Sequence, residues 1–550
     1  MLARMRFRGA ILLAGGLALL TSCGAVDSAV TSPGADKLDA ASTPDVTEVR
    51  TTPDILPPST DIPPVDQTVG ETVTTDVATT DVGPLSPEPV DTGADLPAIP
   101  AGEFPNDPNK PPQAYDAYLV AALDDIQTFW RTNMPAVYNT NYQELSGGVF
   151  PVYPGKRGVP GCGTPRTSWA EVQGNAFYCQ EGDFVAYDDN DLLPQLDKEL
   201  GRAVIGVVFA HEWGHAIQSR LGLLDGSVPT VTTELQADCF AGAWTAHLAA
   251  GESDKLHFTD AEIGQGLAGM ISVADQPGIT SETDIGAHGS AFARVGSFQD
   301  GFESGVKQCA TYIDSPPNPM QFSYQSSDPN ASIQDLENAP YDDTVLAAGD
   351  KCGRGIFQLI ECGLTKYWPP VMESNGTPIT PPTLLAYPAD GPYPDCPGIS
   401  QFKNNVFFCP STNQVMYDDD LGRELYNRVG DFSIGYLVSD GWSEAIQNAL
   451  GSKLGGEKRA LLDDCLTGAF VRSTLPTTTD PNVPTTTEDP NALPGVSASP
   501  GDLDEAVKTA ILVGDESSDA NIVGSPFEKI DAFRVGVLSD LSGCQSRYAS

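Results

Sequence analysis

The sequence predicts an α+β fold in which one domain occurs twice. Apolar residues recur at helical spacing in residues 117–130 and 192–221, and Gly222 is placed to end the second of these segments. Between them, residues 162–187 contain short runs of aromatic and β-branched residues separated by Gly and Pro, which is typical of strands. The third observation is a long internal repeat, which indicates the duplication.

The repeat relates a segment of the first half to a segment of the second half. IGVVFAHEWGHAIQSRLG begins at Ile205 and IGYLVSDGWSEAIQNALG begins at Ile434, and the two share Ile, Gly, Trp, Ala, Ile, Gln, Leu and Gly in register. Further matching pairs begin at Asn175 and Asn405, at Leu235 and Leu461, and at Ser290 and Ser525. Because 550 residues also exceed what one core organises, we expect two copies of one domain, residues 113–314 and 341–550, with a connector over residues 315–340.

The residues before these domains are expected to be an export signal and a tether. Residues 1–23 combine arginines, an apolar run and small residues before a cysteine, which is the pattern of an export signal. Leu20-Thr21-Ser22-Cys23 resembles the bacterial lipobox, which implies a lipid on Cys23; the alternative is a plain secretory signal with an incidental cysteine. Residues 24–112, rich in Thr, Pro, Asp, Val and Ser, are typical of a disordered tether. We therefore expect a protein anchored by its lipid to the outer face of the bacterial cell membrane.

The charge and the cysteines agree with export. The chain has 74 acidic and 30 basic residues and a net charge of −44, which argues against sequence-independent binding to nucleic acid. Of 11 cysteines, ten remain if Cys23 carries a lipid, an even number available for disulfides in an oxidising compartment. The repeat predicts four bridges, first to second and third to fourth cysteine in each copy: Cys162–Cys179, Cys239–Cys309, Cys396–Cys409 and Cys465–Cys544.

The sequence leaves the pairing of Cys352 and Cys362 open. An unbroken helix between them would hold the two residues about 15 Å apart, given a rise of about 1.5 Å per residue, which is too far for a disulfide. Gly353 and Gly355 could interrupt such a helix.

His211-Glu212-Trp213-Gly214-His215 is the strongest chemical signal in the chain. The two histidines lie one helical turn apart, so both imidazoles can reach one metal ion. Glu212 can lie beside the remaining coordination position, where a carboxylate takes a proton from zinc-bound water. The chain has only five histidines, so an accidental match is rare, and we expect one Zn²⁺ per chain.

A third zinc ligand is expected on the following helix, at Glu234. Asp238 lies one turn further along the same face and is placed to accept the outer N–H of a ligand histidine. Glu234 as an ordinary surface acid is the alternative. Asp238 recurs as Asp464 in the second copy, which favours a partly structural role.

The remaining histidines carry weaker signals. His288, in AHGSAFAR, is a candidate donor to the oxyanion of a tetrahedral intermediate, although a loop histidine with no catalytic role is as good an interpretation. His247 and His257 have no motif around them and are predicted to be ordinary helix or surface residues. Tyr187-Asp188-Asp189 recurs as Tyr417-Asp418-Asp419, which favours structure over chemistry.

Taken together, these motifs resemble a known family. HEWGHAIQSRLG, ELQADCFAGAW, GCG followed by NAFYC, and HGSAFAR with a later cysteine are similar to the bacterial neutral zinc metallopeptidases, a gluzincin-like group. The resemblance covers residues 113–314 and implies a zincin-like domain with an active-site helix. It also implies that His211, His215 and Glu234 hold zinc and that Glu212 is the general base.

The second copy departs from that family, which is ordinarily described by one such domain. At the aligned positions the predicted ligands, base and oxyanion donor are replaced by Asp440, Gly441, Glu444, Ala460 and Val523. We therefore predict a folded, catalytically inert lobe, which packs on the first copy, shapes the substrate cleft or binds a protein partner.

The sequence thus predicts a zinc metalloendopeptidase that cleaves peptide or protein substrates at the cell surface. Two alternatives remain. One is a lipid-tethered binding or scaffold protein whose zinc site is structural or inactive. The other is a zinc hydrolase that acts on cell-wall peptides.

Overall fold

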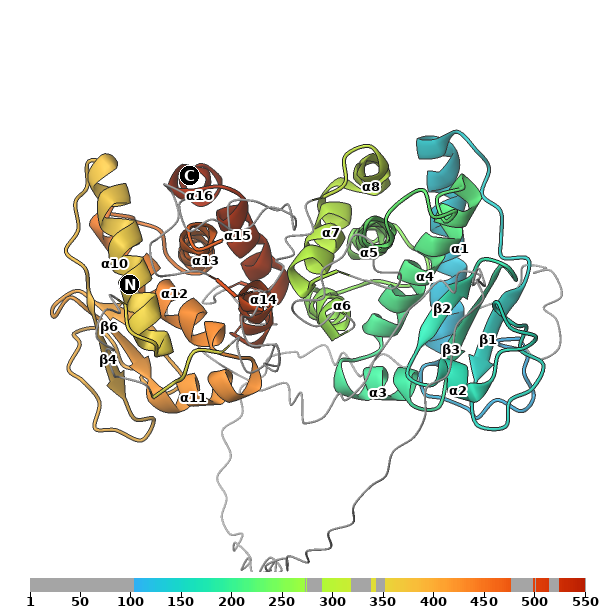
Figure 1. Ribbon diagram of the computed structural model, residues 1–550, viewed down its shortest axis with the longest axis horizontal. Helices are drawn as coiled ribbons and strands as arrows, with labels where there is room; N and C mark the ends of the chain where they lie inside the picture. The colour runs from blue at the N-terminus through green and yellow to red at the C-terminus, as the bar shows by residue number, and fades with distance from the viewer. Residues whose placement is uncertain are drawn as a thin grey trace, which may run out of the picture. The chain divides into compact units, whose positions relative to one another are not determined.

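The computed structural model describes residues 103–272, 274, 289–317, 338–342, 352–475, 498–499, 501–513 and 524–549 (Figure 1). All of them belong to one compact unit. The predicted export signal with Cys23, the tether up to residue 102, most of the connector, His288 and Val523 lie outside the described residues. Within the described ranges, no helix is long and apolar enough to cross a lipid bilayer.

The first half consists of helices with one small sheet. Its elements, in chain order, are α1 (Asp116–Tyr138), β1 (Gly148–Val152), α2 (Trp169–Val172), β2 (Ala176–Cys179), β3 (Phe184–Asp188), α3 (Leu192–Glu199), α4 (Ala203–Leu221), α5 (Thr230–Ala249), α6 (Asp260–Ser272), α7 (Ala291–Ser304), α8 (Val306–Ala310) and the 3-10 helix η1 (Thr311–Ile313).

The second half repeats this arrangement. Its elements are α10 (Ile356–Ser374), β4 (Thr383–Tyr387), β5 (Val406–Cys409), β6 (Gln414–Asp418), α11 (Asp419–Arg428), α12 (Phe432–Ala449), α13 (Glu457–Arg472), α14 (Asp502–Val513), α15 (Pro526–Leu538) and α16 (Leu541–Tyr548).

The two sheets have the same topology. The strand order is β1-β3-β2 in the first and β4-β6-β5 in the second, and in each the central strand is parallel to one neighbour and antiparallel to the other. Phe177 pairs with Ala186 in the first sheet, and Phe407 pairs with Met416 at the equivalent place in the second. The predicted α+β class is confirmed, and the matching sheets agree with the predicted repeat.

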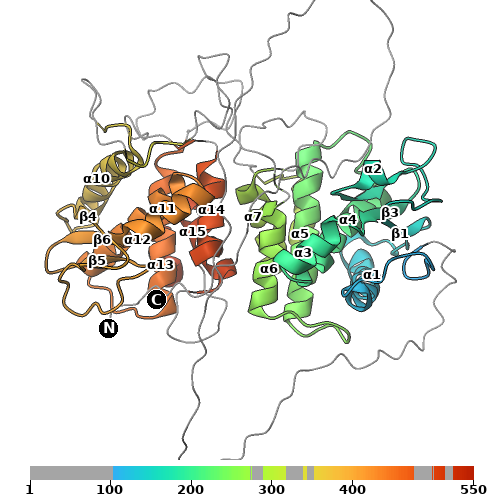
Figure 2. The ribbon, with the colours of Figure 1, turned by 90° about the horizontal axis from the view of Figure 1, so that it is seen from below.

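Helix α4 lies at the centre of the first half, between the sheet and α5 (Figure 2). It is buried along almost its whole length, from Ala203 to Gln218, with only His215 partly accessible in that range. A helix that is apolar on all sides belongs in a core, which explains why its few polar side chains must be satisfied inside the protein. The helix ends at Gly222, which has a left-handed φ of 72° as the sequence predicts.

Helices α5 and α7 pack backbone to backbone through glycines. A Cβ atom on Gly242 would lie 1.9 Å from the carbonyl oxygen of Phe298, and one on Gly301 would lie 1.8 Å from that of Cys239. In the second half, α13 and α15 meet in the same way through Gly468 and Gly536, with clashes of 2.0 and 1.9 Å. Only glycine allows so close an approach, so these positions set the spacing of α5 and α7 and of α13 and α15.

The structure contains the four disulfides that the repeat predicts and a fifth. The predicted bridges join Cys162 to Cys179, Cys239 to Cys309, Cys396 to Cys409, and Cys465 to Cys544. Cys352 and Cys362 also form a bridge, with their Cα atoms 5.3 Å apart. They can do so because α10 begins only at Ile356, so Cys352 lies outside the helix that carries Cys362.

The two halves share one continuous hydrophobic core. Across the boundary, the rings of Phe302 and Phe527 lie 4.6 Å apart, and those of Phe292 and Phe533 lie 6.3 Å apart. The Gln299 side chain donates a hydrogen bond to the Phe527 carbonyl at 3.0 Å. Of the roles predicted for the second copy, packing on the first is therefore present in the structure.

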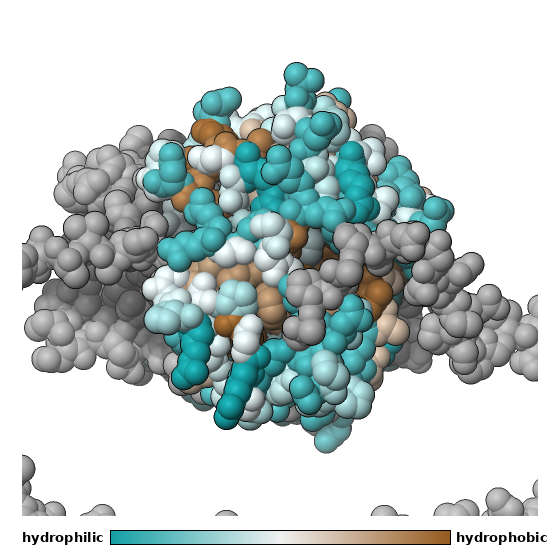
Figure 3. Space-filling view, turned by 90° about the vertical axis from the view of Figure 1, so that its right-hand side faces the viewer, coloured by the Kyte–Doolittle hydropathy of each residue, from teal (hydrophilic) through white to brown (hydrophobic). Residues whose placement is uncertain are grey.

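The face of the molecule drawn in Figure 3 is mainly hydrophilic, and its apolar residues form small, separate patches among those drawn in colour.

We predict that Gly242→Ala lowers the free energy of unfolding by roughly 1–3 kcal/mol, the usual range for an overpacked core, because the new methyl group must push α7 away from α5. Denaturant unfolding measures the change. Gly264→Ala, also in a helix, is the control: its Cβ would meet Pro526 at an ordinary 3.6 Å, so stability should stay equal or rise slightly. Equal stability of both variants would contradict the close packing.

Candidate metal centre

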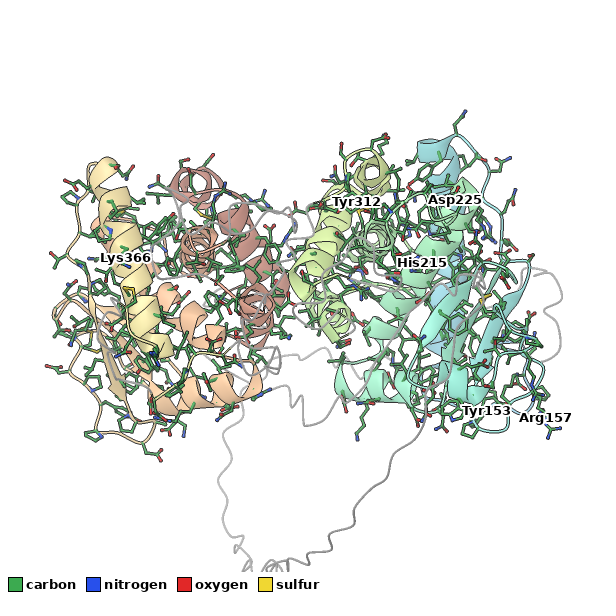
Figure 4. All side chains as sticks on the ribbon, in the orientation of Figure 1. Tyr153, Arg157, His215, Asp225, Tyr312 and Lys366 are labelled. Carbon is green, nitrogen blue, oxygen red and sulfur yellow. A yellow bond between two sulfur atoms is a disulfide. The ribbon has the colours of Figure 1, made fainter. Side chains whose placement is uncertain are left out.

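Helix α4 places His211 and His215 so that both rings face one point. Their Nε2 atoms lie 3.1 Å apart, and the ring planes are perpendicular. Figure 4 shows His215 in the interior of the first half. His211 is buried and the His215 side chain is 13% exposed, so His215 is the more accessible of the two rings.

Glu234, one turn into α5, completes a three-residue group. Its Oε2 atom lies 3.4 Å from Nε2 of His211, and its Oε1 atom lies 3.4 Å from Nε2 of His215. Ligand atoms around a tetrahedral zinc are about 3.4 Å apart, given zinc–ligand distances of about 2.1 Å. The three side chains therefore fit a zinc ion, and three protein ligands leave a fourth position for water or substrate, as catalytic zinc sites do.

Each histidine is oriented from behind by an acceptor for its second ring nitrogen. Nδ1 of His211 lies 2.8 Å from Oδ1 of Asp238, and Nδ1 of His215 lies 2.9 Å from Oε1 of Gln218. A proton on each Nδ1 would be donated to these oxygens, which leaves both Nε2 lone pairs for the metal. The Gln218 side chain is itself held, since its Nε2 donates to the Thr233 carbonyl at 2.6 Å.

Asp238 is in turn held by a buried arginine. Nε and Nη2 of Arg294, on α7, donate to the two carboxylate oxygens at 2.8 and 2.7 Å, and the side chains of both residues are at most 2% exposed. Burial opposes the charge of Asp238, but Arg294 and His211 outweigh it and lower its pKa. Burial likewise opposes a charged His211, yet Asp238 and Glu234 raise the pKa of that ring to about 10, so zinc must displace a proton there.

Glu212 lies on the side of α4 that faces the sheet. It is 1% exposed, and its Oε2 accepts a hydrogen bond of 2.8 Å from the backbone N–H of Tyr178 in β2. Burial raises its pKa, and the neighbouring His211 and His215 act in the opposite direction. A buried carboxylate held in one orientation beside a metal group is placed to accept and release a proton.

Three residues of this site were missed in the sequence, namely Gln218, Arg294 and Tyr178. Gln218 follows His215 by three positions, which puts it on the same helical face, and Arg294 closes the HGSAFAR motif. Both residues could therefore have been predicted from their positions in the sequence. The role of Tyr178 could not, because it depends on a backbone N–H and on the way the sheet meets α4.

The other singled-out residues lie apart from the metal group. His247 is near Glu252, with 3.1 Å between Nδ1 and Oε2, and Nδ1 of His257 faces the Leu248 carbonyl at 3.1 Å. Asp188 accepts hydrogen bonds from two following backbone N–H groups, and Asp189 accepts one from the Tyr115 hydroxyl. Tyr187-Asp188-Asp189 therefore has structural contacts, as predicted. The proposed role of His288 stays a prediction.

The second half keeps the supports of the site without its ligands. Asp464 accepts hydrogen bonds from Lys529 at 2.9 and 2.8 Å, as Asp238 does from Arg294. Nε2 of Gln447 donates to a backbone carbonyl at 2.8 Å, as Gln218 does.

Glu444 makes the contact with the sheet that Glu212 makes in the first half, although it is aligned with a different residue. It is aligned with His215, but its Oε2 accepts a hydrogen bond of 2.8 Å from the Phe408 N–H, which is the contact that Glu212 makes with Tyr178. The place of Glu212 itself is taken by Gly441. In both halves a carboxylate on the central helix therefore accepts a hydrogen bond from the equivalent strand, β2 or β5. Glu444 does so from a position about one turn after Gly441, the residue aligned with Glu212.

One more acidic group of the described residues has metal-like spacing: Asp431, Asp502 and Glu505, in the second half. Each accepts a hydrogen bond from a backbone N–H, those of Ala339, Ser499 and Phe432 respectively. The group lies at the N-terminal ends of α12 and α14, where Glu505 caps α12 through the Phe432 N–H and Asp431 holds the segment at Ala339, so we assign the group a structural role.

Known proteins share the sequence around this centre. Residues 115–312 match the model of the family described as "Putative neutral zinc metallopeptidase". This segment lies within residues 113–314, so the family recognised from the motifs is confirmed there, and with it a zinc-peptidase type of domain.

The relatives themselves carry no described activity. "Uncharacterized protein Rv2575" of Mycobacterium tuberculosis is 29% identical over 252 residues, which cover 40% of this chain and 79% of the relative. "Uncharacterized protein YpfJ" of Escherichia coli K12 is 30% identical over 156 residues, which cover 25% of this chain and 53% of the relative. No solved structure matches the chain.

We predict that Asp238→Asn weakens zinc binding about 10–100-fold, the usual effect of losing a group that orients a ligand. One amide oxygen cannot serve both His211 and Arg294 as the carboxylate does. Zinc affinity is measured by competition with a chelating dye.

Asp464→Asn is the matched control for this prediction. It removes the buried negative charge that pairs with Lys529. We expect it to lower the free energy of unfolding about as much as Asp238→Asn does, by about 3–5 kcal/mol, without changing zinc affinity. If the two variants lowered zinc affinity equally, the effect would be one of general stability.

Proposed function

We propose that the first half of the protein hydrolyses peptide bonds with a zinc ion held by His211, His215 and Glu234. The observation that carries the proposal is the spacing of these three ligands, which matches tetrahedral zinc, next to the buried carboxylate of Glu212. The match of residues 115–312 to a zinc metallopeptidase family supports the same chemistry and a peptide or protein substrate.

Zinc, when bound, supplies a Lewis acid that polarises the scissile carbonyl and makes water acidic enough to attack it. Glu212 takes a proton from the attacking water and later delivers it to the leaving amine. The Tyr178 N–H holds one oxygen of this carboxylate and so fixes the orientation of the group that transfers the proton. Burial makes the carboxylate a stronger base than an exposed glutamate, because it raises the pKa.

We further propose that the enzyme works outside the cell, anchored by a lipid on Cys23. The lipobox-like sequence before this cysteine supports the anchor. Ten cysteines joined in five disulfides support an oxidising compartment. The second half is, in this proposal, a degenerate copy that has lost the ligands and the base and has kept their supporting contacts.

We predict that Glu212→Gln retains one zinc per chain but loses peptide hydrolysis by roughly 10²–10⁴-fold, the range for a general base. The amide oxygen can still accept the Tyr178 N–H, so the local fold is preserved. Zinc content and cleavage of casein or a peptide library are measured together.

Glu444→Gln makes the same change against Phe408 in the second half and should leave hydrolysis unchanged. Undiminished hydrolysis by Glu212→Gln would refute the assignment of the base. A wild-type protein that holds zinc but shows no chelator-sensitive cleavage of peptides would favour the scaffold alternative, and cleavage of purified cell-wall material alone would favour the wall-peptide hydrolase.

A further inference from the structure

Helix α7 belongs both to the metal centre and to the contact between the two halves. Arg294 on this helix holds Asp238, and through it His211. The same helix packs on the second half, where Phe292 meets Phe533 and the Gln299 side chain meets the Phe527 carbonyl. Any contact that holds the first turn of α7 therefore bears on the outer support of the zinc ligands.

The first turn of α7 lacks an acid that its counterpart α15 has. In α15, Ser525 caps the helix, and Glu528 at the third helical position accepts hydrogen bonds from the Ser525 N–H and hydroxyl, which completes a capping box. In α7, Ser290 accepts from the Ala293 N–H at 3.2 Å in the same way. The residue aligned with Glu528 is Ala293, so α7 has no carboxylate of its own at this position.

The second half supplies a carboxylate to this turn, at a different backbone donor from the one that Glu528 serves in α15. Oδ1 of Asp504, on α14, accepts a hydrogen bond of 2.9 Å from the Phe292 N–H, one of the helix-end donors that no carbonyl of the helix can satisfy. Asp504 is 2% exposed, so the bond is shielded from water. The carboxylate also offsets the unfavourable placement of a cation, Arg294, near the positive end of a helix.

Within the ranges that the structure describes, this contact has no equivalent that runs from α6 to α15. The side chains next to Gly201 and Gly430, two aligned glycines, are those of Gln265 and Glu505, so Gly264 of α6 corresponds to Asp504 of α14. Gly264 has no side chain, so it offers no carboxylate to the Phe527 N–H, which is the donor aligned with Phe292. Among the described residues, this helix-capping contact therefore runs from the second half to the first.

We propose that Asp504 of the second half is a positioning residue for the metal centre of the first, acting through the Phe292 N–H, Arg294, Asp238 and His211. The inference rests on the proposed zinc site. In this role the inert half holds the first turn of α7, so that Arg294 keeps both of its hydrogen bonds to Asp238.

Other contacts of α7 do not replace this one. The glycine-mediated approach to α5 occurs at Phe298 and Gly301, six and nine positions after Phe292, and the disulfide at Cys309 lies beyond the helix. These contacts hold the middle and the end of the helix. In the first turn, which precedes Arg294, Asp504 accepts the Phe292 N–H and Ser290 accepts the Ala293 N–H, while the Phe292 ring lies near that of Phe533.

The test measures zinc affinity in the full chain by competition with a chelating dye. Asp504→Ala should raise the zinc dissociation constant about tenfold, the lower end of the usual effect of an outer-sphere change. Asp504→Asn retains an oxygen that accepts the Phe292 N–H and should bind zinc within about twofold of wild type. Glu528→Ala, which removes the acid of the capping box of α15, should lower the free energy of unfolding as much as Asp504→Ala does. It should leave zinc affinity unchanged.

Hydrogen exchange at the Phe292 amide of the wild-type protein provides a second measurement that needs no variant. The amide should exchange as slowly as those in the middle of α7. Fast exchange, or an Asp504→Ala variant that binds zinc as wild type does, would overturn the positioning role while leaving the zinc site intact. A wild-type protein that binds no zinc would instead overturn the proposed function, and this inference with it.

Discussion

The buried ion pair of Asp238 and Arg294 is the interaction on which the metal centre depends. Both side chains lie inside the protein, where an unpaired charge costs several kcal/mol, so each holds the other in place. The carboxylate that results is rigid and charged, and it turns the Nε2 atom of His211 toward His215 and Glu234. The pair also links α5 to α7, so the geometry of the ligands is tied to the packing of the domain.

The second half shows how much of this arrangement belongs to the fold rather than to the chemistry. Asp464 and Lys529 form the equivalent buried pair although no zinc ligand lies beside them. Asp238 thus pairs with Arg294 as Asp464 pairs with Lys529, and it contacts in addition His211, a predicted zinc ligand. A carboxylate that meets the edge of the sheet also recurs, at Glu212 and Glu444, from different positions on the helix.

Sequence patterns predicted the elements that depend on short-range chemistry. Helical periodicity located α4, and the spacing of His211 and His215 on it follows from the turn of the helix. The repeat predicted four disulfides, since two copies must pair their cysteines alike. The pairing of Cys352 with Cys362 stayed open because it depends on where α10 begins, which the composition of that segment does not define.

The sequence by itself determined the class of fold, the zinc ligands to expect and the other residue types that stand at the aligned positions of the second half, because each follows from residue types at fixed spacing along one chain segment. Only the tertiary structure decided which groups support the ligands. Gln218, Arg294, the Tyr178 N–H and Asp504 act across helices, strands and halves, at separations of up to 212 residues for Asp504 and Phe292. Such partners are chosen by packing and burial, which no local pattern encodes.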